Sequence, residues 1–294
     1  MSLEDSISGT VRLSGRLSGC PPGIDATRTL LVLVHGLGGS SESGYMLQMA
    51  GAASSLGMGC LRLNLRGADH EGRDFYHGGL TDDLHAAVSN PPLSGFERIV
   101  CLGFSLGGHV VLRFGTEVEE PRVAALAGVC SPLDLGVGAR AIDRAALGIY
   151  RFYLLRGLRT MHRRLSGLGR LPGDPETAQR ARTLRQWDSA TVVPRFGFRD
   201  VDDYYRRASV GSEIRNLRRP ALMLLTEDDP MVPAAAIRGL VEPETPSELT
   251  IRWFRRGGHL ALPREIDLGI DGPKDWRTQA LLWLLAMGEK RFGG

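Results

Sequence analysis

Residues 98–116, RIVCLGFSLGGHVVLRFGT, decide the fold of this chain. The apolar run Arg98–Gly103 predicts a buried strand, and the apolar residues of Leu106–Thr116 recur at helical spacing. Between them lies the G-x-S-x-G sequence of residues 103–107, which places Ser105 on a tight strand-to-helix turn where a serine can act as a nucleophile. The bare pattern is short, so a glycine-rich turn with an incidental serine is the alternative interpretation.

The same order of a short apolar run and a longer segment of helical period recurs along the chain. It is typical of parallel strands joined by crossover helices, and it predicts an α/β fold with a mostly parallel central sheet and helices on both faces. The segment Ile7–Leu17 alternates apolar with polar or small residues and predicts antiparallel edge strands. The predicted strands of the sheet are Leu30–Val34, Cys60–Leu65, Arg98–Gly103, Val123–Val129, Ala221–Thr226 and Leu249–Phe254, and the predicted helices are Gly44–Leu56, Leu80–Val88, Leu106–Thr116 and Trp276–Met287.

Residues 132–219 interrupt this alternation. They contain no convincing strand, while Ile142, Ala146, Ile149 and Tyr153 recur at helical spacing and predict one amphipathic helix with a buried apolar stripe. A helix that binds a partner or a membrane surface is the alternative. We expect a helical cap inserted into a single α/β domain, whose core comprises residues 1–131 and 220–294.

Composition and charge exclude several classes of protein. The formal charge of +3 and the lack of a basic segment interleaved with aromatic residues argue against a nucleic-acid partner. No signal sequence and no apolar run long enough for a transmembrane helix is visible, so we expect a cytoplasmic protein. Oligomeric state is left open. The four cysteines are too widely spaced for a disulfide framework or a metal knuckle: Cys20, Cys60, Cys101 and Cys130.

A serine hydroxyl is a weak nucleophile until a base takes its proton, so a carboxylate and a histidine are expected downstream of Ser105 in that order. The fifth predicted strand is followed by Asp228 and Asp229, either of which suits the acid, with helix capping as the alternative role. His259 follows the sixth strand and two glycines, which let the backbone approach the serine. Among the seven histidines, it alone combines this order with a loop at the carboxyl end of a strand.

The loop His35-Gly36-Leu37-Gly38-Gly39-Ser40 follows the first predicted strand of the sheet. A loop at this place can supply one half of an oxyanion hole, and the amide after the nucleophile supplies the other half. We therefore predict that the backbone N–H groups of Leu37 and Leu106 bind the oxyanion. A phosphate-binding loop is the competing interpretation, but neither GxGxxG nor GxxxxGK[ST] is present.

A second polar group, Asp69, His70, Glu71, Asp74 and His77, lies in one short stretch of sequence. Histidines and carboxylates can bind a metal, but this spacing matches no known metal site. We therefore expect a solvated loop near the mouth of the site, with no metal and no organic cofactor.

Taken together, these residues resemble the YheT-like branch of the α/β-hydrolases, which includes bacterial esterases and the animal ABHD1, ABHD2 and ABHD3 proteins. The resemblance implies the α/β-hydrolase fold and hydrolysis of carboxylic esters, with Ser105, Asp229 and His259 as the charge relay system. It favours Asp229 over Asp228 because the family's acid is usually followed by a proline four residues later, here Pro233. The supporting motifs are residues 35–40, Asn64-Leu65-Arg66-Gly67, Tyr76-His77-Gly78-Gly79, residues 103–108, Tyr204-Tyr205 with Ser209, Asp228-Asp229-Pro230 and Gly257-Gly258-His259.

Three departures from the family pattern concern substrate preference, since none removes a catalytic group. The segment before residue 28 lacks the usual acidic Asp-Gly-rich start, Ala68 replaces a frequent cysteine, and Leu260-Ala261-Leu262 follows the histidine. Lipid-like or medium- to short-chain acyl esters are the expected small-molecule substrates. An acyltransferase with the same residues and a non-catalytic binding protein of the same fold are the alternatives.

Arginines and aromatic residues of the expected cap suit an amphiphilic ester with an anionic head, although structural packing accounts for them equally well. The aromatic residues concerned are Phe152, Tyr153, Trp187, Tyr204 and Tyr205.

Overall fold

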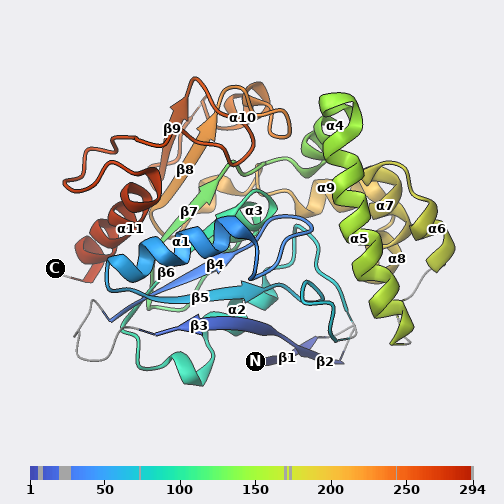
Figure 1. Cartoon of the computed structure of the whole chain (residues 1–294), viewed down its shortest axis with the longest axis horizontal. Coiled ribbons are helices and arrows are strands. Elements are labelled where there is room, and N and C mark those ends of the chain that lie inside the picture. Colours follow the sequence, from blue (N-terminus) through green and yellow to red (C-terminus); the bar gives the residue numbers. More distant parts are fainter. Residues whose placement is uncertain are drawn as a thin grey trace.

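The centre of the computed structural model is a seven-stranded sheet in the order β3-β5-β4-β6-β7-β8-β9 (Figure 1). All neighbouring strands are parallel except β3 and β5, which confirms the predicted α/β class. The structure describes residues 1–5, 9–19, 28–72, 74–168, 171, 174–242 and 244–292. The strands of the sheet are β3 (Ser14–Ser18), β4 (Thr29–Val34), β5 (Gly59–Asn64), β6 (Arg98–Phe104), β7 (Val123–Val129), β8 (Ala221–Thr226) and β9 (Leu249–Phe254).

The six strands predicted for the sheet are confirmed, with no end displaced by more than one residue. Strands β4, β6, β7 and β8 are buried along nearly their whole length, which is why they read as continuous apolar runs. At the N-terminus, β3 is an antiparallel edge strand as predicted, but β2 (Gly9–Arg12) pairs with β1 (Ser2–Asp5) in a separate two-stranded sheet. Ile7, which began the predicted segment, lies outside the described residues.

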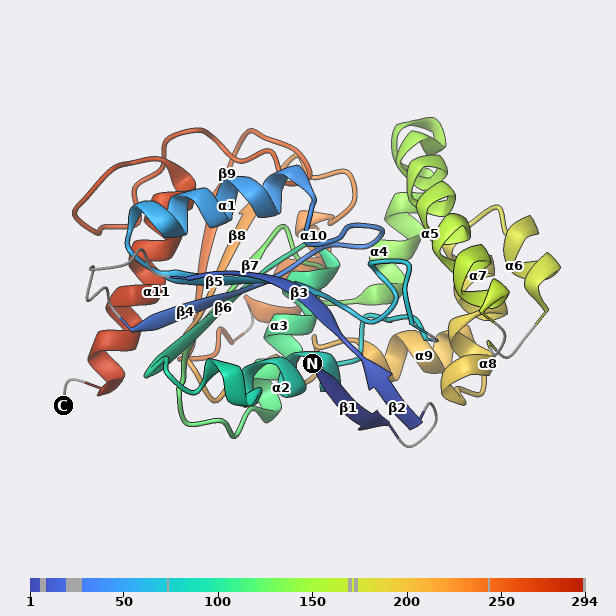
Figure 2. The same cartoon turned by 60° about the horizontal axis from the view of Figure 1, so that its bottom comes forward.

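Helices cover both faces of the sheet, as predicted. Figure 2 shows α1 (Gly44–Ser55) on one side and α2 (Asp82–Val88) and α3 (Leu106–Glu117) on the other. Helix α11 (Trp276–Phe292) packs on the same face as α1 and runs five residues past its predicted end. Two apolar clusters, one on each face, hold these layers together. The remaining short elements are a 3₁₀ turn at Pro91–Leu93, another at Ile214–Asn216, and α10 (Ala234–Val241).

After the carboxyl end of β7, the chain enters a group of helices that lies beside the sheet in both views (Figures 1 and 2). We call Leu135–Ala208 the helical segment; its described residues contain no strand. It comprises α4 (Leu135–Arg144), a 3₁₀ turn (Ala145–Gly148), α5 (Ile149–Gly167), α6 (Pro175–Arg180), α7 (Leu184–Ala190), α8 (Val192–Phe196) and α9 (Val201–Ala208).

The prediction of one amphipathic helix through Ile142 and Tyr153 is wrong. Leu147 and Gly148 have positive φ angles of 54° and 88°, so the chain turns between α4 and α5. Ile142 packs against the core, but Ile149 and Tyr153 are 69% and 76% exposed. The apolar spacing therefore spans two helices, and its second half faces solvent.

The cysteines carry no disulfide among the described residues. Cys60, Cys101 and Cys130 are free and buried, where they pack as small apolar side chains. Cys20 lies outside the described residues. No helix in the described part of the chain has the length and apolar character needed to cross a membrane.

Candidate active site

Ser105 occupies a strained turn between β6 and α3. Its φ and ψ angles are 52° and −120°, in a region that a non-glycine residue enters at a cost of about 1–3 kcal/mol. Small neighbours make the turn possible: a Cβ atom on Gly103 would lie 2.2 Å from the carbonyl oxygen of Gly107. One on Gly107 would lie 2.3 Å from the carbonyl oxygen of His35, and one on Gly108 would lie 1.8 Å from Ser131 Oγ. The glycines of the sequence pattern are therefore required by backbone contacts.

The structure brings His259 to Ser105 across 154 positions of sequence. His259 Nε2 lies 2.9 Å from Ser105 Oγ, and Nδ1 lies 2.9 Å from Asp229 Oδ2. Because a carboxylate only accepts hydrogen bonds, Nδ1 carries the proton, and Nε2 is left free to accept one from the serine hydroxyl. The three side chains therefore form one continuous hydrogen-bonded chain.

Asp229, and not Asp228, faces the histidine. Asp229 is buried at the end of β8, and its Oδ1 accepts hydrogen bonds from the amides of Met231 and Val232 at 2.8 and 3.1 Å. Asp228 is exposed. The two amides fix the orientation of the Asp229 carboxylate.

The loop that carries His259 is held by Gly257, one of the two glycines noted in the sequence, and by Thr226, which the sequence did not point to. The φ angle of Gly257 is 155°, and a Cβ atom there would lie 2.4 Å from the carbonyl oxygen of Ala261. Thr226, the last residue of β8, donates its hydroxyl to the Gly258 carbonyl at 3.2 Å. This threonine ties the histidine loop to the strand that ends beside Asp229.

The glycine-rich loop after β4 lies against the nucleophile. A Cβ atom on Gly36 would be 3.2 Å from Ser105 Cβ, so the loop and the elbow are in close contact. In the described part of the chain, neither the Leu37 nor the Leu106 amide has a protein acceptor outside regular secondary structure. As the first residue of α3, Leu106 also has no acceptor within its helix. Both amides are available to a ligand.

Two tyrosine hydroxyls accept hydrogen bonds from the backbone of this loop. Tyr45 accepts the Gly36 amide at 3.1 Å, and Tyr76 accepts the Gly38 amide at 2.7 Å. His35 is fully buried; its Nδ1 donates to the Gly36 carbonyl, and its Nε2 accepts from the Leu65 amide. Burial lowers the pKa of His35 to about 4, which keeps this imidazole neutral. Sequence reasoning assigned no role to these three side chains.

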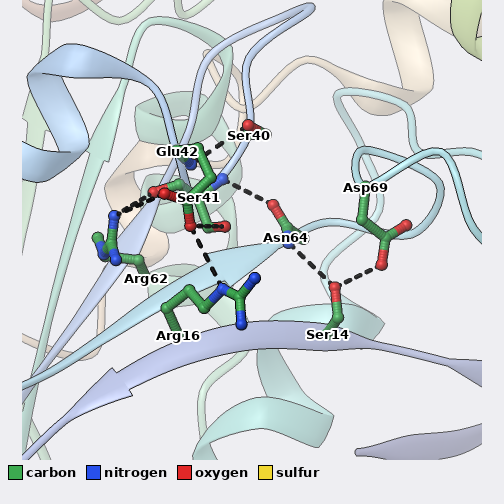
Figure 3. A network of polar contacts seen from close by, with 8 residues as sticks. All are labelled: Ser14, Arg16, Ser40, Ser41, Glu42, Arg62, Asn64 and Asp69. Atoms are coloured by element: carbon green, nitrogen blue, oxygen red, sulfur yellow. Dashed lines mark hydrogen bonds and ion pairs between the residues drawn. The ribbon is translucent and has the colours of Figure 1, made fainter.

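Farther along, the loop is anchored to the sheet by the polar network of Figure 3. The side chain of Asn64, at the end of β5, accepts the Ser41 amide at 2.6 Å and donates to Ser14 Oγ at 3.0 Å. Arg62 donates to the Ser41 carbonyl at 2.7 Å, so both backbone groups of that residue are held. The network joins strands β3 and β5 to the loop, and its outer members Arg16 and Glu42 lie 3.4 Å apart in solvent.

The model of the alpha/beta hydrolase family matches residues 31–266, most of the chain. This chain belongs to the α/β-hydrolase family. The sequence is 28% identical over 226 residues to a monoacylglycerol lipase of Saccharomyces cerevisiae, covering 71% of this chain and 49% of that protein. It is 27% identical over 244 residues to YheT of Escherichia coli, covering 78% and 69%. The mouse phospholipase ABHD3 is 26% identical over 244 residues, covering 81% and 59%. These matches confirm the resemblance to the YheT-like branch.

Solved structures show the same fold. The α/β-hydrolase GrgF from Penicillium sp. sh18 has a TM-score of 0.61 at 17% identity, covering 100% of this chain and 98% of that chain. A monoacylglycerol lipase of Paleococcus ferrophilus has a TM-score of 0.54 at 18% identity, covering 94% and 99%. This α/β-hydrolase spans 49% to 69% of the length of the yeast, mouse and Escherichia coli relatives named above.

Ser105 and His259 open into a cavity of about 460 Å³ between the sheet edge and the helical segment of this α/β-hydrolase. Most of its lining is apolar or aromatic, and Trp187, Tyr204 and Tyr205 are buried at its wall. Phe152 lies outside it and is 66% exposed, while Tyr153 lines the cavity at the surface. No arginine of the described residues lines the cavity, so the expected arginine site for an anionic head is not found there.

The prediction of a solvated loop around residues 69–77 is wrong for Asp74 and His77, which are both buried. Asp74 accepts from Arg66 Nη1 at 3.1 Å and from Arg195 Nε of α8 at 2.8 Å. It therefore joins the core to the helical segment through a buried ion cluster. His77 packs among aromatic rings, and burial lowers its pKa to about 3. No group of three or more potential metal ligands occurs in the described part of the chain.

Proposed function

We propose that this α/β-hydrolase cleaves carboxylic esters through an acyl-enzyme on Ser105. The single observation that carries the proposal is the hydrogen-bonded chain from Asp229 through His259 to Ser105, which ends in an apolar cavity. A binding protein of this fold needs no nucleophile in a strained turn with an oriented base beside it.

His259 Nε2 takes the proton of Ser105 as its Oγ attacks the ester carbonyl. Asp229 holds the imidazole in the tautomer that leaves Nε2 free, and it stabilises the positive charge that forms on the ring. The same proton then passes to the departing alcohol. A water molecule activated by His259 attacks the acyl-enzyme, and the serine regains its proton as the acid leaves.

The amides of Leu37 and Leu106 bind the negative oxygen that develops on the carbonyl. A donor of this kind contributes about 2.7–4 kcal/mol to transition-state stabilisation in enzymes where one was removed. The elbow at Ser105 and the tyrosine-held loop fix both amides before substrate arrives, so little reorganisation is needed during the reaction.

We assign residues 132–219 as a cap over a core of residues 1–131 and 220–294, with the substrate held between them. The apolar wall of the cavity suits a lipid-like acyl chain. Exposed apolar side chains lie at the amino-terminal end of α5, including Leu147 and Ile149 at 101% and 69% exposure. The names of two relatives, a monoacylglycerol lipase and a phospholipase, agree with such a substrate.

Turnover of p-nitrophenyl esters with short, medium and long acyl chains tests this function. We expect free acid to be released in water alone, with highest kcat/KM for medium or longer chains. Turnover that requires an added alcohol acceptor would contradict hydrolysis and support acyl transfer. A folded protein with no turnover of any ester would support a non-catalytic role.

A further inference from the structure

Asp188 is a carboxylic acid in a cavity that is otherwise mostly apolar. It lies on α7 and lines the same cavity as Ser105. Its Oδ2 accepts a hydrogen bond from the Tyr205 hydroxyl at 2.7 Å. In the described part of the chain, Oδ1 has no hydrogen-bond partner, and it is not among the buried polar atoms that lack one. That oxygen is therefore accessible, on a half-buried residue that lines the cavity.

Among the described residues, no lysine or arginine neutralises this carboxyl. The sequence contains 36 lysines and arginines, yet none among the described residues forms an ion pair with Asp188. Arg185, three positions earlier, reaches instead to Asp202 on the outer surface. Burial raises the pKa of Asp188 to about 7, and the nearby carboxyl of Asp143 adds to the rise. The cavity thus holds an acceptor whose surroundings disfavour its charge.

The hydrogen bond from Tyr205 does not by itself explain why an acid occupies position 188. A backbone carbonyl or a neutral amide would accept a hydrogen bond from the tyrosine hydroxyl without placing an ionisable group in an apolar cavity. A carboxyl with one oxygen free becomes favourable when a ligand supplies a donor, because hydrogen bonds to a charged acceptor are stronger than neutral ones. An anionic group beside Asp188 would be repelled by that carboxylate.

We propose that Asp188 determines substrate specificity by accepting a hydrogen bond from a hydroxyl or ammonium group of the ester bound at Ser105. The donor belongs to the part of the substrate that lies against α7, away from the scissile carbonyl. This inference rests on the proposed ester hydrolysis, and it adds a polar substrate class to an apolar cavity.

The test uses matched p-nitrophenyl esters of one acyl length that end in a methyl, a hydroxyl or an ammonium group. A second set carries the same groups on the alcohol side, with release of the acid as the readout. For each protein, the ratio of kcat/KM between the donor-bearing ester and its methyl counterpart is measured at pH 8. The ratio cancels any general loss of activity that a variant suffers.

Wild type is compared with the double variant Asp188→Leu/Tyr205→Phe, which removes both partners and leaves no unpaired hydroxyl. Asp188→Asn removes the charge and keeps an acceptor for a hydroxyl. Asp202→Asn is the matched control, since it makes the same change on the outer surface of the helical segment.

We expect the wild-type ratio to exceed that of the double variant by about tenfold for at least one of the donor-bearing esters. Asp188→Asn identifies the donor: it abolishes a preference for ammonium and retains part of a preference for hydroxyl. Asp202→Asn keeps the wild-type ratios. Equal ratios in wild type and the double variant would overturn the inference while ester hydrolysis stands. Failure of wild type to turn over any of the esters would instead count against the proposed function.

Discussion

The carboxyl-terminal edge of the sheet, which carries Ser105, and the helical segment that faces it differ in how closely their backbones are packed. At the sheet edge, one added methyl group on Gly103 or Gly107 would collide with backbone atoms. In α5, a Cβ atom on Gly157 would meet its nearest neighbour at 3.9 Å, and Leu147 before that helix is fully exposed. Backbone contacts thus constrain the turn at Ser105, whereas the helical segment contributes side chains to the wall of the cavity.

The largest expected effect is at the sheet edge. Ser105→Ala is expected to lower kcat by a factor on the order of 10⁶, because no other group can form the acyl-enzyme. Ser166→Ala, the same change in α5, is expected to leave kcat within about twofold of wild type. Steady-state assays on both variants, with folding checked by circular dichroism, measure the difference. Similar losses in the two variants would place the reaction somewhere other than Ser105.

The next largest difference in kcat is expected between variants of the neighbouring residues Asp229 and Asp228. Asp229→Asn is expected to lower kcat by a factor on the order of 10⁴, because the imidazole loses the partner that fixes its tautomer. The exposed Asp228→Asn serves as the control and is expected to keep kcat near that of wild type. Comparison of kcat for the two variants decides the assignment, and a larger loss in Asp228→Asn would reverse it.

A third contrast compares the same glycine substitution in the two regions. Gly107→Ala is expected to lower the free energy of unfolding by about 1–3 kcal/mol, since its Cβ would lie 2.3 Å from a carbonyl oxygen. Gly157→Ala is expected to raise it by about 0.5–1 kcal/mol, since alanine favours a helix and has room there. Urea unfolding of both variants measures the change. If both substitutions changed the free energy of unfolding in the same direction, the two regions would not differ in packing as described.

A smaller effect is expected where the glycine-rich loop is anchored. Asn64→Ala removes the acceptor of the Ser41 amide and is expected to lower kcat/KM about tenfold, because the Leu37 amide would no longer be held in place. Arg16→Ala, in the exposed outer part of the same network, is expected to have little effect. Ester turnover by both variants tests this, and equal activity would show that the loop needs no anchor at Asn64.

The smallest effect is expected on the outer surface of α5. Phe152→Ser is expected to change the free energy of unfolding by less than about 0.5 kcal/mol, because the ring is 66% exposed. Thermal unfolding provides the measurement. A larger loss would mean that Phe152 is packed against other residues and not exposed.

The sequence predicted the sheet well because each buried strand is a continuous apolar run between turn residues, as in Val123–Val129. It also singled out Ser105, His259 and two neighbouring carboxylates, since chain order and strand ends bring such residues to one edge. It could not place Ile149, because apolar spacing continues through the turn at Leu147 and Gly148 without indicating which half is buried.

Long-range partners were beyond the reach of sequence patterns for the same reason. Asp74 was predicted to be solvated, and one of the two arginines that bury it in an ion cluster, Arg195, is 121 positions away. No sequence pattern distinguishes Asp188, since a lone aspartate in a helix is ordinarily exposed. Only the folded chain shows that it faces the cavity of Ser105.

Covalent labelling by a fluorophosphonate probe, mapped by mass spectrometry, tests directly whether Ser105 is an activated nucleophile. We expect one phosphonate adduct per chain, on the peptide that contains Ser105, with labelling abolished in Ser105→Ala and strongly slowed in His259→Ala. A folded wild-type protein that remains unlabelled, or an adduct on a different serine, would contradict it.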